Sequence, residues 1–110
     1  MEQRRGSVEI RAFRGTRRTS VYREHVLPKG LFGRILAAGA ERDLSLLSSL
    51  EVDGRHELDK PRARRLAEEA TELRMSGGLI ELDHDLTVIA ELARWCTHAS
   101  GDARMTIVGS

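Results

Sequence analysis

Several residue types that mark secreted, membrane-bound or metal-binding small proteins are scarce in this sequence. Its single cysteine, Cys96, has no second cysteine with which to form a disulfide, and the cysteine pairs of a zinc site are absent. The longest run of small and apolar residues, 35–40, is far too short to cross a bilayer, and no apolar segment follows the polar first residues as it does in a signal peptide. We therefore expect a cytoplasmic protein that does not enter membranes, with Cys96 as an unreactive thiol in the core.

Aromatic residues are also scarce, at 4% of the 110 residues, whereas 40% are hydrophobic and 32% are charged. This composition predicts a soluble, ordered chain that forms one domain, residues 1–110, with an aliphatic core. Because a core of this size is modest, burial against a second copy of the chain would add stability, and we expect a homodimer.

Neither sign of charge dominates, because the formal net charge is +1, but the charges are unevenly placed. Residues 1–34 carry nine basic and three acidic side chains, and the remainder carries nine basic and fourteen acidic ones. The two parts complement each other within one chain or between two copies. A basic hairpin permits binding to nucleic acid or to carboxylates, but the acidic remainder makes nucleic acid the last of our hypotheses. The basic positions of the hairpin are Arg11, Arg14, Arg17, Arg18 and Arg23.

Signatures of catalysis and of metal binding are missing as well. The sequence has no glycine-rich phosphate loop, no nucleophile elbow and no His-Glu-x-x-His spacing. The nearest approach to a metal cluster is Asp83, His84 and Asp85, but adjacent residues at the start of a helix point in divergent directions. We interpret both aspartates as caps of the helix that follows, and we expect no metal ion and no cofactor.

The sequence does contain a helix that is apolar on most sides, over residues 83–99, with Ser100 and Gly101 as its stop. Two adjacent apolar stripes leave one polar line, and a helix with this pattern is packed on most sides. The polar line must therefore face solvent, a partner or a ligand groove. The first stripe holds Leu86, Ile89, Ala90, Ala93 and Cys96, the second Val88, Leu92, Trp95 and Ala99, and the polar line Thr87, Glu91, Arg94 and His98.

Two further helices are expected earlier in the chain. Residues 60–76 form an amphipathic helix that Asp59 caps, and residues 31–40 form a short helix that Gly39 ends. Residues 41–49 are compatible with a helical turn or with an extended segment. The longer helix buries Ala63, Leu66, Ala67, Ala70 and Leu73, and its solvent side carries the pairs Arg64–Glu68 and Arg65–Glu69.

Alternating patterns and turn residues predict the strands of an α+β fold. In the first strand Val8, Ile10 and Ala12 share one face. A second strand returns after a turn, and its sequence is compatible with burial of one face or of the other. Asp53 and Gly54 predict a second hairpin turn. The expected strands are residues 7–14, 19–26, 50–52, 55–58 and 103–108, with a link or strand at 79–82. We therefore expect a small antiparallel sheet with two main helices packed on it.

Candidate ligand-binding residues lie on the first hairpin and on the central helix. His25 could act as an acid or base, but alternation places Arg23 and His25 on one face and Tyr22 on the other, so a solvated strand surface is the simpler interpretation. Trp95 adjoins the polar line and follows Arg94, a combination common at binding surfaces, although core packing is the commoner place for tryptophan.

From Leu46 onward the plan of the chain resembles that of small uncharacterised bacterial proteins. The resemblance is carried by Leu46-Leu47, the Asp53-Gly54 turn, Leu66, Glu69 and Leu73 of one helix, Leu92 and Cys96 of the next, and the ending Ile107-Val108-Gly109. In size and in its lack of a catalytic motif, the chain is also similar to the lysinoalanine-forming proteins of cinnamycin- and duramycin-type lanthipeptide biosynthesis. That resemblance implies the addition of a peptide lysine amine to a dehydroalanine, which depends on positioning more than on a reactive protein group.

Two functions of different classes are therefore expected. In the first, the protein binds a ribosomally made peptide and pre-organises it for lysinoalanine formation in antibiotic biosynthesis, through a shaped groove rather than through a nucleophile or a metal. In the second, it is a non-catalytic module that binds a protein partner, such as an immunity or regulatory protein. For the first function, the expected substrate-binding residues are Phe13, Tyr22, Arg23, His25, Phe32, Arg94, Trp95 and His98.

Overall fold

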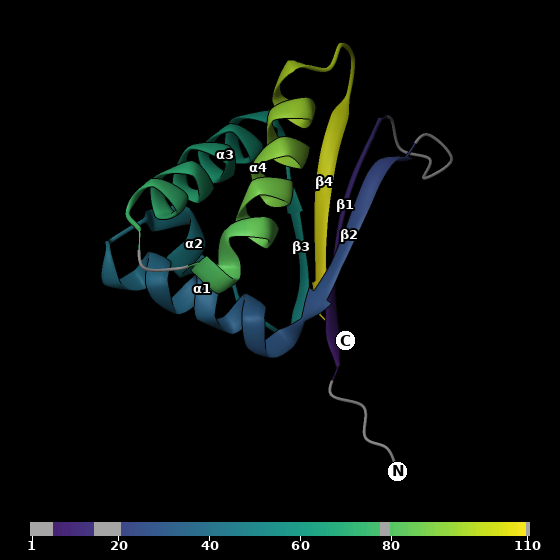
Figure 1. Ribbon diagram of the computed structural model, residues 1–110. Coiled ribbons are helices and arrows are strands. Elements are labelled where there is room, and N and C mark those ends of the chain that lie inside the picture. The colour runs from purple at the N-terminus through teal and green to yellow at the C-terminus, as the bar shows by residue number, and fades with distance from the viewer. Residues whose placement is uncertain (1–5, 15–20, 78–79, 110) are drawn as a thin grey trace.

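The computed structural model describes residues 6–14, 21–77 and 80–109, and it has the α+β fold that the sequence predicts. Four antiparallel strands form one sheet, and the helices lie on one of its faces (Figure 1). In chain order the elements are β1 (Ser7–Arg14), β2 (Val21–Pro28), α1 (Lys29–Glu41), α2 (Ser45–Ser49), β3 (Gly54–Leu58), α3 (Lys60–Met75), a 3-10 helix (Ile80–Leu82), α4 (Asp83–His98) and β4 (Ala103–Gly109). The turn expected at residues 14–18 lies largely outside the described residues.

The strand order in the sheet is β2-β1-β4-β3, so the last strand of the chain lies between the first and the third. Ile10 of β1 pairs with Ile107 of β4 and also with His25 of β2. This register answers the question that the sequence leaves open, because His25 and Leu27 take the helix-covered face of β2. On the opposite face Val26 is 50% exposed.

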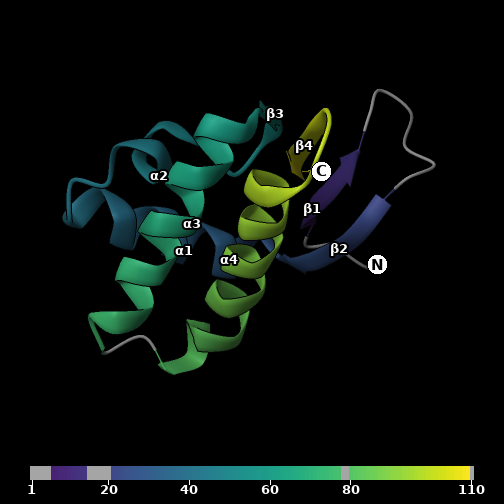
Figure 2. The same ribbon diagram turned by 90° about the horizontal axis from the view of Figure 1, so that it is seen from above.

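The core lies between the sheet and the helices, and α4 is at its centre, as predicted. Helix α4 packs against β1, β2 and β4, while α3 lies beside α4 (Figure 2). Leu86, Ile89 and Leu92 are at most 2% exposed. Trp95 is only partly buried and packs against the edge of the core. The two apolar stripes therefore face the sheet and α3, and the polar line of α4 faces outward.

The expectation that Asp83 or Asp85 caps α4 is wrong. Leu82, at the end of the 3-10 helix, is the N-cap residue, and no side chain caps the helix. Asp83 accepts a hydrogen bond from Arg74 at 3.2 Å, and Asp85 binds His25. Both aspartates lie in the first turn of α4, where the helix dipole favours negative charge, but their side chains are directed to neighbouring elements.

The prediction of a hairpin with its turn at Asp53 and Gly54 is also wrong. Residues 50–53 form no strand, and β3, which starts at Gly54, pairs with β4. The chain before Gly54 crosses the end of β4 instead, since a Cβ on Gly109 would lie 1.8 Å from the carbonyl oxygen of Val52. Gly54 has the positive φ of +95° that its turn-like sequence suggests, but it starts a strand whose partner lies far along the chain.

Helix α1 continues past Gly39 to Glu41, so Gly39 is not its end. The glycine instead permits close contact with α2, because a Cβ there would lie 2.6 Å from Cβ of Leu47. Residues 45–49 form the helical turn that was one of two alternatives. The predicted cap of α3 is confirmed, since Asp59 accepts a hydrogen bond from the amide of Arg62 at 3.2 Å.

Glu69 does not lie on the solvent side of α3, as the sequence pattern suggests. Its side chain is buried and accepts hydrogen bonds from the amides of Leu46 and Leu47 at 3.1 and 2.8 Å and from Nε of Arg65 at 3.0 Å. The carboxylate thus satisfies amides at the start of α2 that the short helix leaves unpaired.

Candidate functional site

A groove runs between α3 and α4 on the outer surface of the helical layer. These two helices lie side by side, as Figure 2 shows, and the groove between them has a volume of about 830 Å³. A volume of this size is within the usual range for ligand sites. Its lining residues are Arg64, Ala67, Glu68, Thr71 and Glu72 of α3 and Arg94, Thr97 and His98 of α4. We refer to this surface as the α3–α4 groove.

The groove forms because small residues line the seam between the two helices. Ala63 and Ala70 on α3 and Ala90 and Ala93 on α4 are buried, and short side chains at a helix contact allow close approach of the helix axes. Above this seam, Ala67 and the two threonines are too small to fill the space between the longer charged side chains. The sequence of both helices therefore produces a trough with a small-residue floor and charged walls.

The charged walls are only partly neutralised by contacts within the protein. Arg64 pairs with Glu68 at 3.5 Å, and Arg94 donates a hydrogen bond across the groove to Oγ1 of Thr71 at 3.2 Å. Glu72 and His98 are exposed, and their side chains make no hydrogen bond or ion pair with any residue that the structure describes. One carboxylate and one imidazole in the groove are thus available to a ligand.

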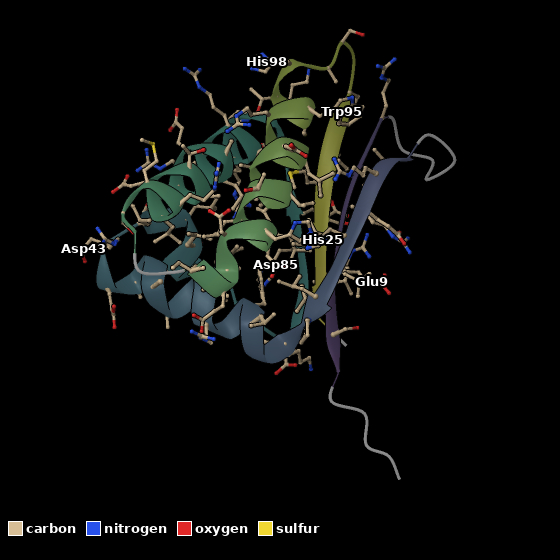
Figure 3. All side chains as sticks on the ribbon, viewed as in Figure 1. Glu9, His25, Asp43, Asp85, Trp95 and His98 are labelled. Atoms are coloured by element: carbon tan, nitrogen blue, oxygen red, sulfur yellow. The ribbon has the colours of Figure 1, made fainter. Side chains whose placement is uncertain are left out.

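A second group of polar side chains connects β2 to α4. Nε2 of His25 lies 2.7 Å from Oδ1 of Asp85, and Nη1 of Arg23 donates to Oε1 of Glu91 at 2.9 Å. The side chains of His25 and Asp85, which face each other in Figure 3, are only 16% and 12% exposed. The ring of His84 lies edge-on to that of His25 at 5.9 Å between centroids. These pairs hold the edge strand against the helix.

The structure separates the residues that the sequence brings together as one binding site. Arg94 and His98 line the α3–α4 groove, whereas Arg23 and His25 contact α4 from β2. Trp95 lies on α4, partly buried against the core (Figure 3). The remaining members are Phe13 and Phe32, which are 6% and 1% exposed, and Tyr22, whose side chain lies outside the described part of the structure. In this conformation Phe32 offers almost no surface to a ligand.

Several groove residues were missed by the sequence interpretation, although a signal for them exists. Arg64, Glu68 and Glu72 follow one another at intervals of four, so they form a line along α3. The spacing of Thr87, Glu91, Arg94 and His98 predicts the polar line of α4. What the sequence does not contain is the information that these two lines face each other across an antiparallel helix pair.

The single cysteine is not a nucleophile of this site. Burial raises the pKa of the Cys96 thiol to about 11, and the residue is fully buried. Within residues 6–14, 21–77 and 80–109, no three His, Cys, Asp or Glu side chains are placed so that they could hold a metal ion. None of the helices in that part of the chain combines the length and apolarity needed to span a membrane.

Comparison with protein-family models, with curated protein sequences and with solved structures yields no match. A function for this chain is therefore inferred from the groove and its side chains.

Proposed function

We propose that this protein binds a peptide segment in the α3–α4 groove. The observation that carries the proposal is the combination of an open trough of about 830 Å³ with walls that bear both signs of charge. A peptide offers amines, carboxylates and amide groups along one backbone, so it complements such walls better than a uniformly charged polymer does. We further propose that the protein works in the cytoplasm, as its single buried cysteine favours.

The concrete form of this function that we propose is lysinoalanine formation in lantibiotic biosynthesis. In that reaction the lysine amine of the peptide forms a bond from Nζ to the β-carbon of a dehydroalanine. The double bond is lost, the nitrogen releases a proton and the α-carbon gains one. Orientation of the two reacting groups can supply roughly 7–11 kcal/mol of the barrier. The carboxylate of Glu72 would orient the lysine amine by accepting a hydrogen bond from it.

Peptide binding is tested by selecting a displayed library of random peptides against the immobilised protein. Selection against a Thr97→Trp variant, in which an indole fills the groove, should lose the enriched sequences. Thr87→Trp is the matched control, because both threonines lie on α4 and donate to the carbonyl four residues earlier, at 2.8 Å each. Enrichment that survives in the Thr97→Trp variant, or no enrichment with the unchanged protein, would refute binding in the groove.

The reaction is tested with a dehydrated lanthipeptide precursor. Ring formation leaves the mass unchanged but converts the primary amine of the lysine into a secondary amine, so the product is detected by mass spectrometry as peptide whose lysine no longer accepts a tag specific for primary amines. We expect the tag to be lost with the unchanged protein and retained with the Thr97→Trp variant. Full tagging after incubation with the unchanged protein would exclude this activity while leaving peptide binding intact.

A second candidate is a non-catalytic module that binds a protein partner. The observation that favours it is that Arg23 and His25, two polar residues expected at a reactive site, are engaged in contacts with α4. The same library selection covers this case, because the enriched peptides would then represent a segment of the partner. A homodimer remains a prediction, to be measured by sedimentation equilibrium.

A further inference from the structure

We infer that the α3–α4 groove also receives a second copy of this chain, with α3 of each copy lying over α4 of the other. A groove covered by a second copy is closed to a peptide, so the second copy regulates the groove, and to that extent the inference rests on the proposed function. Three features of the groove support it.

The first feature is the antiparallel direction of α3 and α4, which lie side by side in Figure 2. Lys60, at the start of α3, donates a hydrogen bond to the carbonyl of Ala99, which directly follows α4. At the other end of the pair, Arg74 donates to Asp83, the first residue of α4. A step toward the N-terminus of α3 is therefore also a step toward the C-terminus of α4.

The second feature is that acidic groups of α3 and basic groups of α4 lie at matching levels along the groove. The guanidinium of Arg94 lies 3.2 Å from Oγ1 of Thr71, which places it beside Glu72, the next residue of α3. One helical turn further in the common direction, Glu68 lies opposite His98. The α3 wall therefore presents two carboxylates, and the α4 wall presents a guanidinium and an imidazole at the same two levels.

The third feature is that three of these four groups lack a partner of opposite charge among the described residues. Arg94 donates to a neutral threonine hydroxyl, and the side chains of Glu72 and His98 make no hydrogen bond or ion pair within that part of the chain. Glu68 pairs with Arg64 at 3.5 Å, but both side chains are exposed, and such a pair contributes little stability. Each of the four groups is therefore available to a partner of opposite charge outside the chain.

A two-fold axis that runs along the groove, parallel to both helices, supplies these partners. Rotation about this axis lays α3 of each copy over α4 of the other and keeps every residue at its own level. Glu72 then meets Arg94 of the other copy, and Glu68 meets His98, each twice because a two-fold interface is self-complementary. Both forms of an imidazole carry an N–H that a carboxylate accepts. An axis across the helices instead lays α4 over α4, where Arg94 and His98 meet groups of their own kind.

The size of the helical face predicts a weak association. Helices of 16 residues are about 24 Å long, and two of them packed side by side present a face about 20 Å wide. Each copy then buries roughly 500 Å², which is below the roughly 800 Å² per partner of a stable interface. We therefore expect a dimer that forms at about 10–100 μM protein and that a peptide bound in the groove displaces.

Sedimentation equilibrium of charge variants tests the interface. Glu68→Lys with Glu72→Lys makes both walls of the groove basic, and Arg94→Glu with His98→Glu makes both walls acidic. Each of these variants should self-associate at least about tenfold more weakly than the unchanged protein. An equimolar mixture of the two variants should associate again, because the α3 wall of each then meets an α4 wall of opposite charge.

The variant with Glu41→Lys and Glu51→Lys is the matched control. It makes the same change of charge as the basic variant at two exposed positions outside α3 and α4, so it should self-associate like the unchanged protein. Circular dichroism of each variant establishes that it is folded.

Self-association that the groove variants leave unchanged, a mixture of them that remains monomeric, or an unchanged protein that stays monomeric up to about 1 mM would overturn the inference. A peptide enriched in the library selection should convert the dimer into monomer, and one that binds the groove while the dimer persists would also overturn it. If the selection yields no groove-dependent peptide while the charge variants behave as expected, the proposed function fails and the interface stands.

Discussion

At the level of single residues, Glu69 illustrates how one buried carboxylate connects two elements. It accepts hydrogen bonds from two amides of α2 and from Arg65, although its side chain is only 4% exposed. A buried charge is tolerated when several hydrogen bonds satisfy it. Its removal costs stability, because its former partners are then left buried without a hydrogen bond.

Replacement of Glu69 by alanine should therefore lower the free energy of unfolding by about 3 kcal/mol, because it leaves two buried amides without acceptors. Urea denaturation measures the change. Glu68→Ala, one position earlier and exposed, should cost less than about 1 kcal/mol. Equal effects of the two substitutions would show that the buried hydrogen bonds contribute little.

The burial of Cys96 leads to a second prediction. Because desolvation raises the pKa of its thiol to about 11, almost no thiolate exists at pH 8, and a disulfide reagent should react with the folded protein very slowly. In denaturant the reaction should be rapid and complete. The rate for the folded protein should rise as the pH approaches 11. Rapid stoichiometric labelling at pH 8 without denaturant would contradict the assigned burial.

The case of Glu69 also shows where sequence-based interpretation reaches its limit. The interval between Arg65 and Glu69 correctly predicts their contact, because that interval depends only on helix geometry. It cannot predict the contact with Leu46 and Leu47, which depends on how α2 is placed against α3. The same limitation explains the aspartates at the start of α4, whose partners Arg74 and His25 lie on other elements.

At the level of elements, two of the three glycines of α1, Gly33 and Gly39, have different roles. A Cβ at Gly39 would meet the side chain of Leu47 at 2.6 Å, whereas a Cβ at Gly33 would meet Val52 at an ordinary 3.6 Å. Gly39 is required by the approach of α2, and Gly33 is not required by any close contact of this kind.

Alanine substitutions at these two positions should therefore have opposite effects on stability. Gly39→Ala should destabilise the protein by about 1–3 kcal/mol through overpacking. Gly33→Ala should stabilise it by about 0.5–1 kcal/mol, since alanine favours the helical backbone. Thermal denaturation of both variants measures the difference. A loss of stability in both would mean that α1 and α2 are packed differently.

The contact between His25 and Asp85 should couple β2 to α4. Because both side chains are largely buried, a double-mutant cycle with alanine should give a coupling free energy of about 1 kcal/mol or more. The pair of Arg23 and Glu91 connects the same two elements but is 43% and 47% exposed, so its coupling should be smaller. Urea denaturation of the single and double variants gives both values, and a larger coupling for the exposed pair would contradict this assignment.

At the level of the whole molecule, the spacing of apolar residues predicts individual helices and strands but not which of them lie next to one another. The two main helices and the strands at residues 7–14 and 103–108 were predicted from local patterns, because each has one face or more that must be buried. The prediction of a hairpin at Asp53 and Gly54 is wrong because the strand that pairs with β3 is β4, which lies far along the chain. The α3–α4 groove could not be predicted for the same reason, since its two walls belong to helices whose relative placement is a property of the fold.

The position of β4 has a consequence for how this chain acquires its structure. When a ribosome has released everything up to Met75, the hairpin partners β1 and β2 are available, but β3 has no strand to pair with, since its neighbour in the sheet is β4. The nascent chain must therefore wait for β4 before β3 can join the sheet. The pairing of β4 with β1 and β3 then connects segments that are far apart in the sequence.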